Sequence, residues 1–206
     1  DIIKIVTNLE NCKLLSTDKI LESKTHKILI DNMDGSYRIK NNYMTPLSSI
    51  NSEPTAKNQL DLYSYFDKSS KDLNKQFIFL FGNNIGSSPS PFIHNYVLIK
   101  NDISNIDYVN FETNNFLNIN ELTDKPYFFG ASVTMPFKEN FSKDDDSILA
   151  INTLNKKGRF LAFDNTDTKA INYFLKDQPT VILGTGGAAV GAIIACINSN
   201  IDNIIV

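Results

Sequence analysis

Residues Thr180 to Ile197 read TVILGTGGAAVGAIIACI and contain the clearest folding signal in the chain. They begin with a short apolar run, Val181 to Leu183, of the kind that forms strands buried on both faces. Three glycines, Gly184, Gly186 and Gly187, follow, and a proline-free segment rich in Ala and Ile continues to Ile197. The pattern predicts a strand, a tight glycine turn and a helix, which is how a dinucleotide-binding βαβ unit begins.

In such a unit, Gly184 allows the turn and Gly186 lets the backbone approach a pyrophosphate, which would lie on free N–H groups at the start of the helix. The same glycines would also suit a strand–helix turn in which they serve packing alone. Asn203 to Val206 predicts the second parallel strand, and a residue that reads the adenosine ribose normally follows that strand. The sequence is therefore expected to be a piece of a longer protein, and these residues leave NADP and NAD both open.

Length, composition and charge exclude several classes of protein. A length of 206 residues predicts one or two domains, and an apolar fraction of 42% is enough for a core. The net charge is −3 and the charges are scattered, so no nucleic-acid partner is expected. No apolar run is long enough to span a membrane, and Cys12 and Cys196 are far apart in the sequence. These features predict a reduced, cytoplasmic chain without a membrane partner.

The first segment, DIIKIV, predicts a strand that carries Lys4 among Ile and Val. A lysine inside a barrel core would lose hydration and become a neutral nucleophile for carbonyl groups, whereas on an edge strand it would face water. Further along, Arg38 lies in MDGSYRI, where its planar fork of donors could hold a carboxylate or remain solvated. The segment PTAKNQL, from 54 to 60, predicts a polar loop.

The order DIIKIV, MDGSYRI, NNYMTP and PTAKNQLDL resembles the C-terminal part of a type I 3-dehydroquinate dehydratase, a (β/α)8 barrel that uses a Schiff-base lysine. The resemblance implies that residues 1–70 are a partial barrel whose substrate is 3-dehydroquinate. It implies that Lys4 is the Schiff-base lysine, that Arg38 binds the substrate carboxylate, and that Thr55 and Gln59 belong to the closing loop. The catalytic histidine of the family would precede residue 1, so no dehydratase activity is expected from this piece.

Residues 67–76 are polar and predict a linker. The strongly apolar run FIFLF, from 77 to 81, predicts a strand that leads into GNNIGSSPSPFIHN. There, Ser88 and Ser90 alternate with prolines, which stiffen the backbone and could hold both hydroxyls toward a polyhydroxylated carboxylic acid. A plain Ser/Pro turn is the alternative. His94 is expected to pack or cap a helix rather than to act in catalysis.

Two further polar positions follow predicted strands. Lys138 comes just after a strand that ends at Pro136, where its ammonium could pass a proton to or from an alcohol. The alternative is an exposed lysine at the start of a helix. The run Asn165-Thr166-Asp167 predicts a turn after a strand followed by a capped helix, and a capping role is the alternative for Asp167.

The motifs GNNIGSSPSPFIHN, GASVTMPFK, AINT, DNTD and LGTGGAA, in this order, resemble shikimate dehydrogenase over residues 77–206. The resemblance implies an α/β fold, with a shikimate-binding domain over 77–172 and the start of a Rossmann domain over 178–206. It implies NADPH-dependent reduction of 3-dehydroshikimate to shikimate with Lys138 and Asp167 as the catalytic pair. It assigns substrate binding to Ser88, Ser90, Thr134, Asn152 and Asp167, and NADP(H) binding to Gly184, Thr185, Gly186, Gly187, Ala188 and Ala189.

A dehydratase followed by a shikimate dehydrogenase resembles the C-terminal end of the fungal pentafunctional arom polypeptide, an enzyme of aromatic amino acid biosynthesis. The GASVTMP motif and the FET at 111–113 favour it over the plant bifunctional enzyme. The resemblance implies small-molecule substrates and a homodimer. Val190 stands where the family usually has an arginine, which removes a positive charge near the cofactor. A non-catalytic domain with a structural role and a quinate/shikimate dehydrogenase are the competing interpretations.

Overall fold

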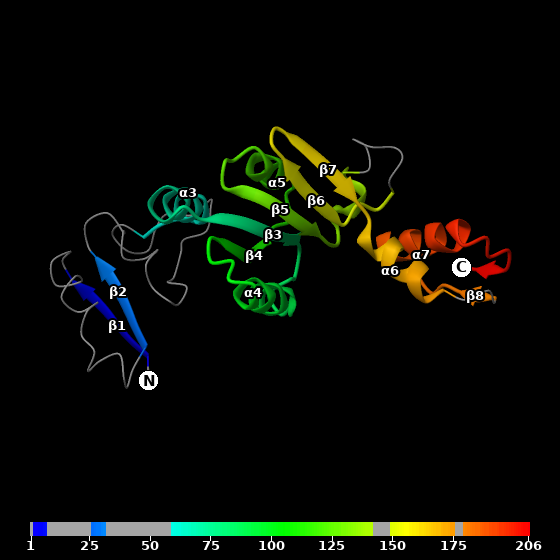
Figure 1. The fold of residues 1–206 in the computed structure, drawn as a ribbon, viewed down its shortest axis with the longest axis horizontal. Helices are drawn as coiled ribbons and strands as arrows, with labels where there is room; N and C mark the ends of the chain where they lie inside the picture. The colour runs from blue at the N-terminus through cyan, green and yellow to red at the C-terminus, as the bar shows by residue number, and fades with distance from the viewer. Residues whose placement is uncertain (1, 8–25, 32–58, 142–148, 176–178) are drawn as a thin grey trace. The chain divides into compact units, whose positions relative to one another are not determined.

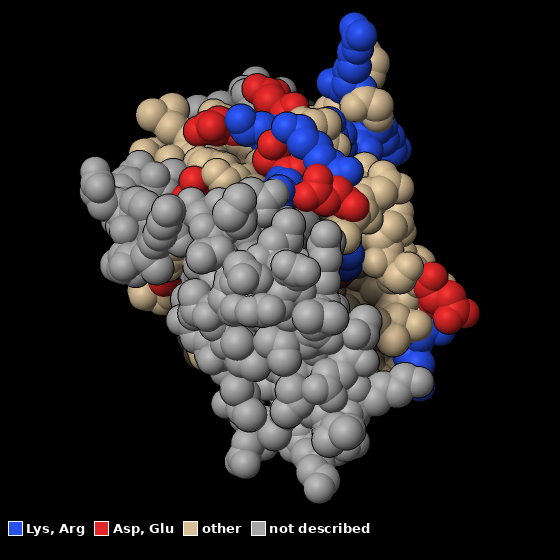
Figure 2. Space-filling view, turned by 90° about the vertical axis from the view of Figure 1, so that its left-hand side faces the viewer, with Lys and Arg blue, Asp and Glu red and all other residues tan. Residues whose placement is uncertain are grey.

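The computed structural model describes residues 2–7, 26–31, 59–141, 149–175 and 179–206. The chain forms two compact units, which comprise residues 1–75 and 76–206 and are described separately. A search of the described residues for a helix that could cross a membrane found none of sufficient length and apolar character. Figure 2 shows one face of the molecule, on whose described part Lys and Arg side chains are interspersed with Asp and Glu.

The first unit contains two parallel strands and a helix. Strand β1 (Ile2–Thr7) pairs with β2 (His26–Asp31), with Lys4 opposite Ile28. The prediction of a linker over 67–76 is wrong, because helix α3 (Leu62–Leu73) runs through most of it. Asp61 caps this helix by accepting from the Ser64 N–H at 2.9 Å. The polar residues that suggested a linker form pairs four residues apart, which stabilise a helix locally: Lys68–Asp72 at 3.3 Å and Lys71–Asp67 at 2.6 Å.

The second unit is built on a five-stranded sheet with the strand order β4-β3-β5-β6-β7. Its first three strands are parallel, and the last two are antiparallel. The elements are β3 (Gln76–Gly82), β4 (Ile106–Glu112), β5 (Phe128–Val133), β6 (Thr153–Lys157) and β7 (Phe160–Asp164). This mixed α/β sheet confirms the predicted fold class for this part of the chain.

Alternating side chains of β3 supply both faces of the sheet, because successive residues of a strand point to opposite sides. Phe77, Phe79 and Phe81 share one face with Phe111 and Phe128, and their rings stack or meet edge to face at centroid distances of 5.6–6.3 Å. All five are at most 1% exposed. Burial of each such ring stabilises the fold by roughly 2–3 kcal/mol. This aromatic cluster is the core of the second unit.

Helices α4 (Ser90–Lys100) and α5 (Phe116–Thr123) lie on opposite sides of the sheet (Figure 1). Helix α4 connects β3 to β4, which pairs with one edge of β3. Helix α5 then connects β4 to β5, which pairs with the other edge of β3. The direction of winding therefore reverses at β3. In open α/β sheets, ligands bind beyond the carboxyl ends of the strands at such a switch point.

The predicted strand–turn–helix–strand unit is present at the end of the chain. Strand β8 (Thr180–Val181) pairs in parallel with β9 (Ile204–Ile205), and helix α7 (Gly187–Asn198) joins them. The expectation that the apolar run is buried on both faces is wrong, since Ile182 is 8% exposed but Leu183 is 93% exposed. Ile182 packs against α7, while Leu183 has no such cover within the described part of the chain.

Candidate active site

Polar residues from four segments meet at one edge of the second unit's sheet. Strands β3 and β5 both end there, and the loop after β3 contacts the loop after β5 through a hydrogen bond from Asn83 N–H to the Met135 carbonyl, 3.1 Å. The start of β6 and the end of β7 lie at the same edge, because Asn152 accepts from Val133 N–H at 2.7 Å and donates to the Asp164 carbonyl at 3.1 Å. The sheet thus gathers the predicted site residues of this unit at its switch point.

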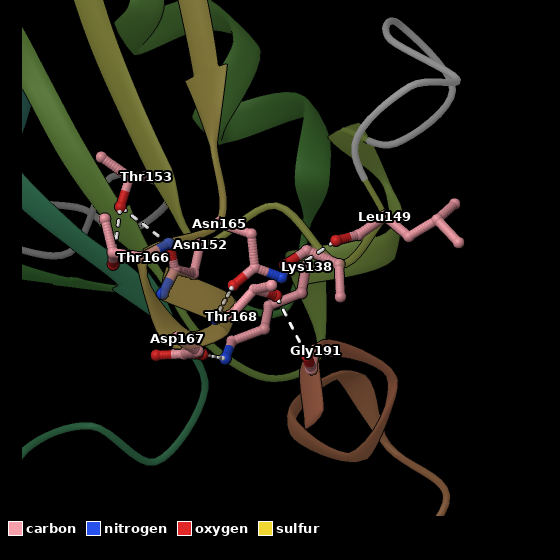
Figure 3. A network of polar contacts seen from close by, with 10 residues as sticks. Lys138, Leu149, Asn152, Thr153, Asn165, Thr166, Asp167, Thr168 and Gly191 are labelled. Carbon is pink, nitrogen blue, oxygen red and sulfur yellow. Dashed lines mark hydrogen bonds and ion pairs between the residues drawn. The ribbon is translucent and has the colours of Figure 1, made fainter. Parts of the chain in front are cut away.

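Lys138 and Asp167 form an ion pair in which Nζ lies 2.5 Å from Oδ2 (Figure 3). They are 29 residues apart in sequence. The predicted helix start at Lys138 is a single 3-10 turn, η1 (Phe137–Glu139), whereas Asp167 lies in the first turn of helix α6 (Thr166–Phe174). The Lys138 side chain is 16% exposed and that of Asp167 is 40% exposed. The lysine is therefore mostly enclosed, and the carboxylate that holds it faces solvent.

Asn165, rather than Asp167, caps helix α6, so the capping alternative for Asp167 is wrong. The Asn165 side-chain oxygen accepts from Thr168 N–H at 3.0 Å. Its Nδ2 donates to the carbonyls of Leu149 and Ala150, both at 3.0 Å. Asn165 is 6% exposed, so its whole amide group is used inside the fold. Because the cap is supplied by a neighbour, the Asp167 carboxylate remains available to Lys138.

Asn152 lies beside this pair and is 8% exposed. It immediately precedes β6. Its Oδ1 accepts from Thr166 N–H at 2.9 Å, from Thr166 Oγ1 at 3.1 Å and from Thr153 Oγ1 at 2.8 Å. These donors leave the Nδ2 group of Asn152 without a partner among the described residues, so it can donate to a ligand oxygen.

Thr134 follows β5 directly, and its N–H donates to the Phe81 carbonyl at 2.8 Å. This contact brings the turn after β5 against the end of β3. Gly82 is required at that point, because a Cβ there would lie 2.5 Å from Thr134 Cγ2 and 2.7 Å from Ile85 Cγ2. The sequence analysis did not single out this glycine. It allows the loops that carry Thr134 and the two predicted binding serines to lie side by side.

Ser88 and Ser90 are brought together, as the sequence predicted, at the start of α4. The Ser88 hydroxyl donates to Ser90 Oγ at 3.1 Å, and Ser90 N–H donates to Ser88 Oγ at 3.3 Å. No side chain caps α4. Two hydroxyls beside an uncapped helix N-terminus form an environment that favours an anion. His94 packs, as expected, with its ring stacked on Tyr108 at a centroid distance of 4.2 Å.

The glycine turn before α7 fits a bound pyrophosphate. Gly184 has φ +127°, a conformation that favours glycine, and a Cβ at Gly184 or Gly186 would meet nothing within 4 Å. Gly186 stands at the N-cap position, so the first N–H groups of α7, from Gly187 to Ala189, have no partner within the helix. The helix has no acidic residue in its first turn and no side-chain cap. These residues would hold a diphosphate group by backbone N–H donors.

Helix α7 and the predicted catalytic lysine are in direct contact. A Cβ added at Gly187 would lie 3.1 Å from Lys138 Cδ and 3.3 Å from Lys138 Cβ. One turn further along the same face of α7, Thr168 Oγ1 donates to the Gly191 carbonyl at 3.1 Å. The glycine turn and the Lys138–Asp167 pair therefore adjoin each other, as a site that combines a nucleotide with a second small molecule requires.

The residues assigned to a dehydratase lie in the first unit. Lys4 is in β1, which is described by its backbone. Arg38 and Thr55 lie outside the described residues, and Gln59 lies just before α3. Nothing in the described part of this unit brings these four residues together.

Two features of this site have no local signal in the sequence. Tyr108 is a buried residue of β4, and only the tertiary fold places it beside Ser132 of β5 and Ser90 of α4. The run Asn165-Thr166-Asp167 predicted a capped helix, but the two bonds from Asn165 to the carbonyls of Leu149 and Ala150 depend on the tertiary fold.

The second unit is an α/β domain whose candidate site lies at the switch point of its sheet, followed by a strand, a glycine turn, a helix and a parallel strand. Residues 80–154 match the family model described as the shikimate dehydrogenase substrate binding domain.

Known proteins that resemble the chain agree with this match. A shikimate dehydrogenase (NADP(+)) of Caldicellulosiruptor bescii is 36% identical over 131 residues, which cover 54% of this chain and 45% of that protein. The structure of shikimate dehydrogenase 1 from Peptoclostridium difficile is 30% identical, with a TM-score of 0.54, over 63% of this chain and 53% of that one. The structure of dehydroquinate dehydratase and shikimate dehydrogenase from S. pombe AroM shares the fold over 98% of this chain and 44% of that chain, with 24% identity and a TM-score of 0.50. The chain spans about half the length of the curated relatives it matches.

Proposed function

We propose that residues 76–206 supply the shikimate-binding domain and the first part of the NADP(H)-binding domain of a shikimate dehydrogenase. The enzyme would reduce 3-dehydroshikimate to shikimate in the cytoplasm. The Lys138–Asp167 pair carries the proposal, because it places a proton donor against the glycine turn, just after the loop that contacts the end of β3. The names of the curated relatives, each a shikimate dehydrogenase (NADP(+)), support both the activity and the cofactor.

NADPH, when bound, supplies the hydride, and the protein supplies orientation and a proton. The Ser88 and Ser90 hydroxyls bind the substrate carboxylate. Lys138 Nζ gives a proton to the ketone oxygen as it becomes a hydroxyl, and takes one back in the reverse direction. Asp167 holds that ammonium group in place with its Oδ2. Thr134 and the Nδ2 group of Asn152 bind ring hydroxyls, and the α7 N-terminus binds the cofactor diphosphate.

For the first unit, we propose that residues 1–70 are the C-terminal part of a type I 3-dehydroquinate dehydratase within an arom-type polypeptide. The four quoted segments and the parallel pairing of β1 with β2 support this origin. Lys4 would be the Schiff-base lysine, and Arg38, Thr55 and Gln59 would contact 3-dehydroquinate. The homodimer also stays a prediction.

The activity is tested by oxidation of shikimate and of quinate by the complete protein, with NADP+ and with NAD+ as separate cofactors. Turnover of shikimate with NADP+ supports the proposal. Equal turnover of quinate would make the protein a quinate/shikimate dehydrogenase, and a folded protein that neither binds nor oxidises shikimate would favour a structural role.

Replacing Ser88 or Ser90 with alanine should raise KM for shikimate about 10- to 100-fold, because each hydrogen bond to a charged group contributes roughly 1.5–3 kcal/mol. Ser87→Ala is the matched control, since Ser87 is an exposed serine of the same loop and should leave KM unchanged. Equal effects of all three substitutions would contradict the assignment of the carboxylate to Ser88 and Ser90.

Gly187→Ala should reduce kcat about tenfold, because the new methyl group presses on the Lys138 stem and a small displacement of a reacting group is costly. The melting temperature should change little, since the side chain that must move is flexible. Initial rates at saturating shikimate and NADP+ provide the measurement. An unchanged kcat would mean that Lys138 can shift without loss of its function.

A further inference from the structure

Asn110, on strand β4, carries a side-chain amide whose oxygen is unused within the described part of the chain. Its Nδ2 donates to the Ile85 carbonyl at 3.1 Å, whereas its Oδ1 is buried and accepts no hydrogen bond there. The opposite orientation of the amide would set two acceptors against each other, so the donor contact identifies the nitrogen. A buried acceptor without a donor is destabilising, and this side chain therefore calls for a reason other than stability.

The contact that Asn110 makes holds the middle of the serine loop, residues 83–90. Ile85 is 5% exposed, whereas the loop residues on either side of it, 83–84 and 86–87, are exposed. The Ile85 side chain packs in an apolar cluster with residues of β3 and β4. Its carbonyl is bound to β4 by the Asn110 amide. Ile85 is therefore the point at which the middle of this loop is attached to the sheet.

The same carbonyl also closes the turn that carries Ser88. Ser88 N–H donates to the Ile85 carbonyl at 2.9 Å, so the two residues are the first and last of a four-residue turn. A carbonyl oxygen can accept two hydrogen bonds, and this one accepts from both Ser88 and Asn110. Because a shift of the Ile85 peptide would move Ser88 with it, Asn110 is linked to Ser88 through one shared acceptor.

Ser90 is held in place by a different set of contacts. It begins helix α4, and its N–H donates to Ser88 Oγ at 3.3 Å. The helix itself is attached to β4 by the Asn95 amide, which bonds the N–H and the carbonyl of Tyr108, each at 2.8 Å. The position of Ser90 is therefore set by α4, whereas that of Ser88 is set by the Ile85 turn.

We propose that Asn110 is a positioning residue for the carboxylate site: its amide donor holds the Ile85–Ser88 turn, so that the Ser88 hydroxyl is in place before the substrate carboxylate binds. A loop that is already ordered loses less entropy when a ligand binds, which strengthens binding. The unused Oδ1 lowers stability, while Nδ2 supplies the turn with its donor. The inference rests on the proposed shikimate dehydrogenase function and adds to it a residue that acts through Ser88.

The test is Asn110→Leu in the complete protein, which keeps the size of the side chain and removes both the donor and the unused acceptor. KM for shikimate should rise about three- to tenfold, as expected for the loss of one hydrogen bond, with kcat within about twofold because the Lys138–Asp167 pair is not altered. The melting temperature should not fall, since the buried acceptor is removed as well. Asn101→Leu is the control: its Nδ2 also donates to a carbonyl, that of Val97, but at the far end of α4, so KM should stay unchanged.

Asn110→Asp provides a measurement that packing alone would not affect. At neutral pH the introduced carboxylate has no proton to donate, so the affinity for shikimate should fall. As the pH is lowered through the pKa of that carboxyl group, its protonated form can donate to the Ile85 carbonyl. The affinity relative to the unmodified protein at the same pH should then recover, whereas that of Asn110→Leu should stay reduced. A relative affinity of Asn110→Asp that does not change with pH would contradict the role of the donor.

Double mutants test whether the effect passes through Ser88. In a Ser88→Ala background, Asn110→Leu should have no further effect on KM, whereas in a Ser90→Ala background its effect should persist. Equal effects in the two backgrounds would overturn the positioning role. If the unmodified protein oxidises shikimate while KM is unaffected by Asn110→Leu, the positioning role alone fails. If it neither binds nor oxidises shikimate, the proposed function fails and the positioning role with it.

Discussion

Lys138→Ala should reduce the rate of shikimate oxidation by about three orders of magnitude. A positioned general acid or base contributes roughly 10²- to 10⁴-fold to such a reaction, and Lys138, which Asp167 holds at 2.5 Å, is the group proposed to exchange the proton. The alanine side chain removes the ammonium, and the other residues of η1 cannot supply one: Glu139 is exposed and carries the opposite charge, and Phe137 is a buried apolar residue. Steady-state oxidation of shikimate with NADP+ measures the effect.

The predicted loss lies in kcat rather than in binding. Shikimate affinity, measured at equilibrium, should weaken much less than turnover, because the substrate contacts proposed for the serine loop and Asn152 are unchanged. Lys169→Ala is a matched control, since Lys169 also pairs with an aspartate, Asp164, but is 68% exposed. Comparable losses in the two variants would contradict a specific role for Lys138, as would a Lys138→Ala enzyme that keeps most of its activity.

Asn165→Ala should lower the free energy of unfolding of the second unit by about 3 kcal/mol. The substitution removes the cap of α6 and the Nδ2 donor to two carbonyls, that of Ala150, which is 2% exposed, and that of Leu149, which is 48% exposed. Loss of a cap costs about 1 kcal/mol, and each unsatisfied buried group costs about 1–3 kcal/mol unless water reaches it. Activity should fall as well, because α6 carries Asp167.

The measurement is urea unfolding followed by circular dichroism, since the chain contains no tryptophan. Asn165→Asp keeps the cap acceptor but loses the amide donor, so its stability should lie between those of the native protein and the alanine variant. Asn172→Ala, on the same helix with an exposed bond to Ser199, should change the free energy by less than about 0.5 kcal/mol. If Asn165→Ala changed the free energy of unfolding as little as Asn172→Ala, the cap and the two carbonyl contacts of Asn165 would not contribute to stability.

Local patterns were sufficient for several features. A strongly apolar run, FIFLF, predicted β3, and glycines after an apolar run predicted the turn before α7. The run Asn165-Thr166-Asp167 predicted a capped helix, which is α6. These features depend on residues close together in sequence, so periodicity and spacing carry the information. The prediction of a linker over residues 67–76 was wrong, although it also used a local pattern. The polar composition indicated a linker, but the charged residues form pairs four residues apart that stabilise helix α3.

The sequence by itself determined which residue types stand after which strands, and hence the class of chemistry that the site can perform. Only the tertiary structure decided which of these residues lie close together. Lys138 lies beside Asp167 because antiparallel β6 and β7 return the chain to the edge where β5 ends. The burial of each residue likewise depends on what packs over it, as Ile182 and Leu183 illustrate. Contacts between distant segments follow from strand order and register, which no local pattern specifies.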